Sequence, residues 1–268
     1  MLRDITLGQY YQTDSVLHRL DPRVKLAGTL LYIISLFFFR NFLGYIIAAV
    51  FLTIVIKLSH VPFKFMVKGM KAILFLLLIT VVFNLFLTPG EALVTFWKLT
   101  ITREGLQTAF TMAVRLVMLV IGSSIMTLTT TPNNLTDGME KGMRPLKVFR
   151  VPVHEVAMMM SIALRFIPIL LEETDKIMKA QIARGADFES GNLIKRAKAL
   201  VPLLVPLFIS AFRRANDLAM AMEARCYRGG EGRTKMKPLI YQKRDRIAYF
   251  CILVYLAVSI GVGRLILL

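Results

Sequence analysis

Five long apolar segments constrain this chain more than any other feature of its sequence. A membrane-spanning helix needs roughly 17–25 mostly apolar residues, because the bilayer core offers no water to satisfy exposed backbone groups. Such segments lie at 26–39, 42–56, 72–87, 105–128 and 247–267, the first two being completed by flanking residues. Since 56% of all residues are also hydrophobic, we predict an all-α integral membrane protein with about five transmembrane helices.

Two further apolar runs lie at 156–171 and 199–212, inside the basic stretch 129–246. Each run begins apolar and ends charged, which favours two long amphipathic cytoplasmic helices at the membrane surface. Arg165 in the first run and the prolines at 202 and 206 in the second argue against spanning helices. The alternative, in which both runs span the membrane, gives seven spans and leaves the two helix ends on opposite faces.

The distribution of Lys and Arg predicts the orientation. The N-terminal stretch, the loop at 57–71 and the segment 129–246 together carry 29 Lys and Arg, whereas the opposite side carries Arg40, Lys98, Arg103 and Arg264. Because cytoplasmic loops are enriched in these residues, the N-terminus and 129–246 are predicted to be cytoplasmic in the cell membrane. The predicted organisation is a four-span membrane domain (1–128), a coupling-helix region (129–246) and a C-terminal transmembrane helix (247–268).

The formal net charge of +17 does not require a nucleic-acid partner. Positive-inside bias and anionic lipid headgroups account for the excess of basic residues. Catalytic motifs are missing as well: the sequence has no phosphate-binding G-x-x-x-x-G-K-[ST] pattern, no H-E-x-x-H and no cysteine pair with metal-ligand spacing. We therefore expect no enzyme activity, no cofactor and no metal site.

Two short tails with the same form end the predicted amphipathic helices. Each consists of alanine, arginine and a small residue, and the two arginines are 41 residues apart (225 minus 184). The residues are Ala183, Arg184 and Gly185 in the first tail, and Ala224, Arg225 and Cys226 in the second. A small residue at a helix end lets the backbone turn and leaves the arginine projecting.

An arginine near a helix C-terminus can simply complement the helix macrodipole. Two matching tips on one membrane face favour a functional interpretation, in which each arginine fills a groove on a partner and holds a carboxylate with its planar guanidinium. Both tails follow the same loose order of a proline-containing apolar run, a charged patch and an alanine-containing run. This order indicates a weak internal repeat.

One charge, Arg115, falls near the middle of the predicted fourth span, where it costs about 2.5–3.5 kcal/mol on insertion scales. It could mark a polar pathway, as in a self-contained secondary transporter. The simpler interpretation is a single hydrogen bond or ion pair to a neighbouring helix.

With these tails, the sequence resembles the transmembrane T component of energy-coupling factor transporters, in its shared-module form. The stretches DSVLHRLDPRVKL (14–26) and TTTPNNLTDGMEKGMRPLK (129–147) are also similar to that family, and the resemblance covers essentially the whole chain. The second tail departs from the family pattern, because it ends in cysteine instead of glycine.

The resemblance implies a scaffold in a vitamin or micronutrient importer. Two ABC-type ATPase subunits would bind ATP and dock on the two tails, with Arg184 in one groove and Arg225 in the other. An interchangeable membrane S component would bind the substrate and be reoriented by this chain. The alternatives are a self-contained secondary transporter and the dedicated cobalt or nickel type of T component.

The topology can be tested by thiol labelling. After Cys226 and Cys251 have been replaced by serine, Asp175→Cys and Lys235→Cys should each resist an impermeant thiol reagent in right-side-out vesicles, because both positions are predicted to be cytoplasmic. Labelling at 175 alone would establish the seven-span arrangement and contradict the common-face argument.

Overall fold

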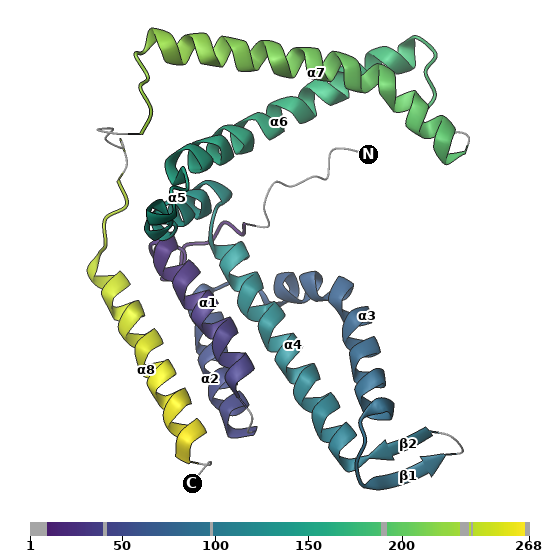
Figure 1. Ribbon diagram of the computed structural model, residues 1–268, viewed down its shortest axis with the longest axis vertical. Coiled ribbons are helices and arrows are strands. Elements are labelled where there is room, and N and C mark those ends of the chain that lie inside the picture. Colours follow the sequence, from purple (N-terminus) through teal and green to yellow (C-terminus); the bar gives the residue numbers. More distant parts are fainter. Residues whose placement is uncertain are drawn as a thin grey trace. The chain divides into compact units, whose positions relative to one another are not determined.

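The computed structural model describes residues 10–39, 42–96, 99–188, 192–230, 236 and 238–265, and the chain divides into two units (Figure 1). The first, which we call the bundle unit, comprises residues 8–141 and 239–268. The second, the helix-pair unit, comprises residues 142–238. A short N-terminal stretch is also assigned to it, but this stretch lies outside the described residues. The bundle unit is thus built from both halves of the chain, and the helix-pair unit lies between them in sequence.

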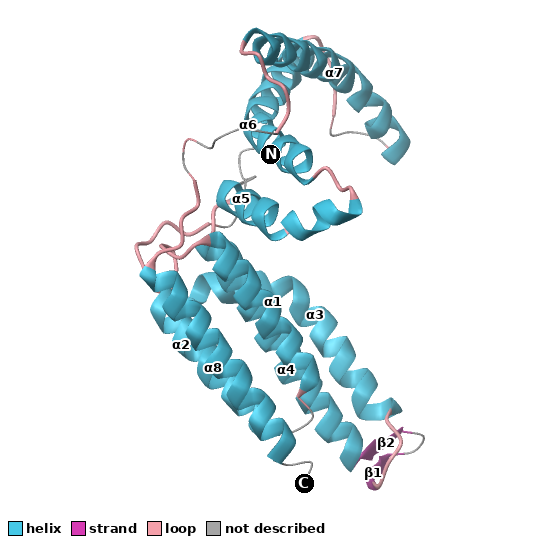
Figure 2. Ribbon diagram, turned by 60° about the vertical axis from the view of Figure 1, so that its left-hand side comes forward, coloured by secondary structure: helices cyan, strands magenta, loops and turns pink. Residues whose placement is uncertain are grey.

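The bundle unit contains five long helices that lie side by side in Figure 2. They are α1 (Pro22–Phe38), α2 (Phe42–Ser59), α3 (Phe63–Leu87), α4 (Arg103–Thr129) and α8 (Lys243–Leu265). The shorter helix α5 (Pro132–Gly142) follows α4 along the chain. Each long helix contains most of one predicted span. The helix α3 begins well before the predicted start at 72, since its boundary is set by Pro62, which stands at the N-cap in an extended conformation. Residues 266 and 267 of the last predicted span lie outside the described residues.

A short β-hairpin, which the sequence analysis did not predict, connects α3 to α4. Strands β1 (Ala92–Phe96) and β2 (Leu99–Thr102) pair antiparallel, with Phe96 opposite Leu99. Thr102 then caps α4, because its hydroxyl oxygen accepts a hydrogen bond from the Gly105 N–H at 3.0 Å and donates one to the Thr88 carbonyl at 2.8 Å. This cap holds the ends of α3 and α4 together.

The bundle core lies where α1, α2, α4 and α8 meet, and Met66 of α3 also belongs to it. Leu36, Ala48 and Met66 are fully buried, and Tyr32 packs so closely on Gly122 that a Cβ there would lie 2.6 Å from the tyrosine ring. Small residues at helix contacts allow this close approach within membranes. The outward faces, in contrast, carry exposed apolar side chains such as those of Phe38, Phe75 and Phe250, as a lipid-facing surface requires.

Five helices in the described residues are long and apolar enough to cross a membrane. They are α2, α4, α8 and, from the helix-pair unit, α6 (Val153–Ala183) and the Lys198–Ala224 part of α7 (Leu193–Ala224). The chain is therefore a multi-pass, all-α membrane protein, as predicted, although the set of helices differs from the predicted spans. The helix α1 has only 17 residues, and the apolar segment described within α3, Ile73–Leu87, is also shorter than the other five.

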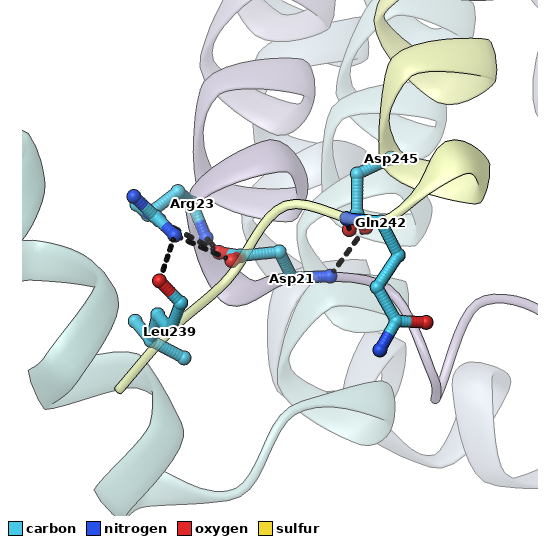
Figure 3. A network of polar contacts seen from close by, with 5 residues as sticks. All are labelled: Asp21, Arg23, Leu239, Gln242 and Asp245. Atoms are coloured by element: carbon cyan, nitrogen blue, oxygen red, sulfur yellow. Dashed lines mark hydrogen bonds and ion pairs between the residues drawn. The ribbon is translucent and has the colours of Figure 1, made fainter. Parts of the chain in front are cut away.

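Two buried aspartates link the first helix of the bundle to the last (Figure 3). Asp21 is the N-cap of α1 and accepts a hydrogen bond from the Arg23 N–H at 2.9 Å. Asp245, in the first turn of α8, reaches back to the Gln242 N–H at 2.7 Å, and its other oxygen accepts the Asp21 N–H at 2.9 Å. Each carboxylate therefore caps its own helix, and Asp245 also binds the start of α1.

Arg23 extends this network to the segment that precedes α8. Its guanidinium pairs with the Asp21 carboxylate at 2.8 Å, donates to the Leu239 carbonyl at 3.0 Å and stacks on the Tyr241 ring. Burial alone would raise the pKa of the Asp21 carboxyl, but hydrogen bonds from the Arg23 side chain and backbone outweigh this and hold the pKa below its usual value. Asp21 thus stays ionised near neutral pH.

The aspartate network should contribute measurably to stability. Asp245→Ala removes the acceptor of two backbone N–H groups and should lower the free energy of unfolding by about 2 kcal/mol, because buried donors left unsatisfied cost about 1–3 kcal/mol. Thermal unfolding of the purified chain in detergent measures the loss. Asp14→Ala, which removes only an exposed ion pair with Arg19, should change little, and equal effects of the two substitutions would contradict the assigned role.

Candidate coupling surface

The two tails predicted from the sequence end helices α6 and α7, and both ends have the same hydrogen-bond pattern. In α6 the Gly185 N–H bonds to the Ile182 carbonyl at 2.9 Å, and the Ala186 N–H bonds to the Gln181 carbonyl at 3.0 Å. Arg184 occupies the C-cap position. This pair of crossed bonds is the Schellman motif, which satisfies carbonyls left free at a helix end.

The end of α7 repeats this motif residue by residue. The Cys226 N–H bonds to the Glu223 carbonyl at 2.8 Å, the Tyr227 N–H bonds to the Met222 carbonyl at 3.0 Å, and Arg225 is the C-cap. The residue after each arginine has a left-handed backbone, with φ of 87° at Gly185 and 55° at Cys226. Because both helices stop in the same way, the two arginines hold equivalent positions.

All six predicted site residues are exposed: Ala183, Arg184, Gly185, Ala224, Arg225 and Cys226. Within the described residues, neither arginine side chain has a hydrogen bond or an ion pair. A guanidinium beside two small exposed residues is free to bind a carboxylate or a carbonyl group of another molecule bidentately.

Helices α6 and α7 pack antiparallel, so their arginine tips lie at opposite ends of the pair. Near one end the Gln181 side chain reaches the Pro202 carbonyl, and near the other the Tyr227 hydroxyl contacts the Met158 sulfur at 3.1 Å. Helix α6 has 26 residues (184 minus 158) between these ends, so the tips are on the order of 40 Å apart. Figure 1 shows the two helices crossing, with their C-terminal ends pointing apart.

An ion pair marks the middle of the crossing. The Arg214 guanidinium lies 2.5 Å from the Glu173 carboxylate, and these residues are 41 positions apart, the same offset that separates the two tips. The repeat that maps Arg184 onto Arg225 therefore maps Glu173 onto Arg214. Such a contact between equivalent positions occurs where an approximate twofold axis passes between two helices, so the helix pair is pseudo-symmetric about this ion pair.

Beside the ion pair, small residues of α7 face larger apolar residues of α6 across a groove of about 290 Å³. Its apolar lining includes Ile162, Phe166 and Leu170 of α6, and Ala211, Ala215 and Ala219 of α7. Sequence inspection did not single out Glu173, Arg214 or this groove. The ion pair could have been predicted by applying the 41-residue offset between the tips to the charged residues of the first helix.

The intramembrane charge at Arg115 has a partner inside the bundle. Its Nε and one terminal nitrogen donate hydrogen bonds to the Tyr45 hydroxyl of α2 at 3.0 and 2.7 Å, and its guanidinium lies 5.6 Å from the centre of the Phe37 ring. This agrees with the structural interpretation of Arg115, a hydrogen bond to a neighbouring helix. Among the described residues, no group of three or more His, Cys, Asp and Glu could hold a metal ion.

The chain combines a multi-pass bundle with a pair of helices whose exposed ends are equivalent. This arrangement is consistent with the transmembrane subunit of a transporter. The family model described as CbiQ, cobalt transport protein, matches residues 13–236. Energy-coupling factor transporter transmembrane protein EcfT of Clostridium kluyveri is 60% identical over 262 residues, which is 97% of each chain. The proteins of that name from Thermosediminibacter oceani and Bacillus subtilis are 54% and 47% identical, over 92% and 91% of this chain and 94% and 93% of their own. The chain belongs to this family of energy-coupling factor transmembrane components.

The two helix ends should respond differently to the same substitution. Gly185→Ala should lower the stability of the chain by about 1 kcal/mol, because an alanine in a left-handed conformation is strained, although no neighbouring atom lies within 4 Å of the added Cβ. Cys226→Ala should be close to neutral, since a Cβ is already present there. Thermal unfolding of both purified variants measures the difference, and equal losses would show that backbone strain is not the cause.

Proposed function

We propose that this chain is the scaffold of an energy-coupling factor importer, in which it couples ATP hydrolysis by two cytoplasmic ATPases to the reorientation of a substrate-binding S component. The observation that carries the proposal is the pair of equivalent, exposed arginine tips at opposite ends of a pseudo-symmetric helix pair. Two similar ATPase subunits related by an approximate twofold axis would present two similar grooves, and each tip would fill one of them.

The coupling follows from this geometry. A rearrangement of the two ATPases on ATP binding or hydrolysis would change the distance between the grooves and thus displace the tips. Because the helices cross at the Glu173–Arg214 ion pair, a change at the tips would open or close the crossing, as in a hinge or shear motion. The chain would supply no catalytic group of its own, and ATP would bind to the partner subunits.

The apolar faces of the helix pair supply a surface for the S component. Val201, Val205, Phe208 and Phe212 of α7 are more than half exposed, at 53%, 53%, 61% and 73%. A contiguous exposed apolar surface of this kind is characteristic of contact with a membrane or with another apolar protein. An apolar surface without fixed polar partners also suits S components of different sequence, which supports the shared type that serves several vitamins or micronutrients.

One observation favours the alternative within the same family. The matching family model is described as a cobalt transport protein, which would suit the dedicated cobalt or nickel type of T component. The high identity to EcfT proteins over nearly the whole chain supports the shared type more strongly. A self-contained secondary transporter gains no support, because Arg115 is bound to Tyr45 and marks no polar path.

The two tips can be tested as a bivalent contact. Arg184→Ala or Arg225→Ala alone should weaken ATPase binding by about 2–5 kcal/mol yet leave a complex held by the other tip, whereas the double variant should release both ATPases. Arg184→Lys keeps the charge but loses the bidentate geometry, so it should behave more like the alanine variant than like the wild type. Co-purification and substrate uptake in vesicles measure assembly and coupling.

The control is Lys243→Ala, which removes an exposed basic residue outside the tips and should change neither assembly nor uptake. If the double alanine variant still co-purifies with both ATPases and transports normally, the arginines only complement the helix dipoles. If Arg184→Lys retains full assembly, a positive charge alone is sufficient and the groove does not require the planar guanidinium.

A further inference from the structure

The bundle unit contains an apolar cavity that the proposed function does not use. It has a volume of about 280 Å³ and lies between α1, α2, α4 and α8. For comparison, an engineered apolar cavity of about 150 Å³ stays free of water and binds benzene. A cavity of this size and lining is therefore a site for an apolar group.

Aromatic residues line one part of the cavity, and another part reaches the surface. Phe51 of α2 and Tyr32 of α1 line the cavity, and behind them both rings pack against Tyr255 of α8, with the Phe51 and Tyr255 ring centres 4.4 Å apart. Towards the end of α2 and the start of α8, the lining side chains of Ile54 and Ile247 are exposed, at 52% and 62%. The opening thus lies on the outer, apolar surface of the bundle.

Two cationic side chains line the cavity, and they differ in their partners. The Lys25 amine is occupied, because it donates to the Thr129 carbonyl at 2.8 Å and to the His18 carbonyl at 3.3 Å. Arg244, in the first turn of α8, has a buried Nε without a hydrogen-bond partner among the described residues. A buried guanidinium nitrogen of this kind requires an acceptor, and a phosphate oxygen is a strong one.

The parts of the four helices that line the cavity lie at one end of the bundle. They are the starts of α1 and α8 and the ends of α2 and α4. Lys57, in the last turn of α2, adds a further positive charge beside the lining residue Leu58. The distribution of Lys and Arg along the sequence predicts that this end lies in the cytoplasmic leaflet, where anionic lipids attract basic residues. An acyl chain beside a phosphate matches both the apolar cavity and the cation at its mouth.

We propose that this cavity binds one anionic phospholipid, with an acyl chain between the four helices and the phosphate on Arg244. The lipid would complete the packing of α8 against α1 and α2 and would satisfy the Arg244 Nε. A free phosphate ion would satisfy the arginine but would leave the cavity empty.

Native mass spectrometry of the full chain, delipidated in a mild detergent, tests the proposal. Palmitoyl-oleoyl phosphatidylglycerol should occupy a first site at least tenfold more tightly than phosphatidylcholine with the same chains. Arg244→Gln should abolish this preference, whereas Arg246→Gln, which changes an exposed arginine of the same helix that does not line the cavity, should retain it. Cys251→Phe, which fills the cavity from α8, should weaken the first binding step of both lipids tenfold or more.

Three outcomes would overturn the proposal. Equal effects of Arg244→Gln and Arg246→Gln would show that the lipid phosphate does not lie on Arg244. Unchanged lipid binding by a folded Cys251→Phe variant would place the lipid outside the cavity. Competition by inorganic phosphate at the concentration of the lipid would show a simple anion site. If Cys251→Phe does not fold, the comparison of the two arginine variants still decides.

Discussion

The contact between Asp21 and Asp245 holds the bundle unit together at the point where its two chain segments meet. The chain leaves the bundle after α5, forms the helix pair and returns at Leu239. The returning segment is fixed at once, because Arg23 binds the Leu239 carbonyl and Asp245 binds the start of α1. Since both carboxylates also cap their own helices, one small polar cluster satisfies backbone groups that the start of α1 and the start of α8 would otherwise leave unpaired. The first and last helices of the bundle depend on it for their register.

The same network fixes the point at which the chain returns to the bundle unit. The helix-pair unit is continuous in sequence with the bundle unit at 141–142 and at 238–239. At the second of these boundaries, Leu239 and the start of α8 are held by a buried network of charge-assisted hydrogen bonds, which are about twice as strong as neutral ones.

The helix-pair unit is held together differently. Its two long helices bury few side chains. They contact each other at the Glu173–Arg214 ion pair, along the groove beside it and near both ends of the pair. Much of their apolar surface is exposed in the chain alone. A membrane or other proteins would be needed to cover this surface. The internal repeat is weak in sequence, and the equivalent positions that the structure shows lie at the crossing and at the tips.

The amino-acid sequence by itself determined the all-α membrane architecture, the approximate position of the long helices and the six residues at the two helix ends. The length of an apolar segment and the presence of small residues beside an arginine are local properties of the sequence. Long helices and their ends can therefore be predicted from short stretches of it. The sequence did not determine the β-hairpin between α3 and α4, the pairing of Asp21 with Asp245, or the ion pair at the crossing of α6 and α7. The hairpin pairs residues only 3 to 10 positions apart, in a short connection that lacks a clear turn signal. The other two contacts join residues 224 and 41 positions apart, and only the packing of the helices decides which distant polar groups meet.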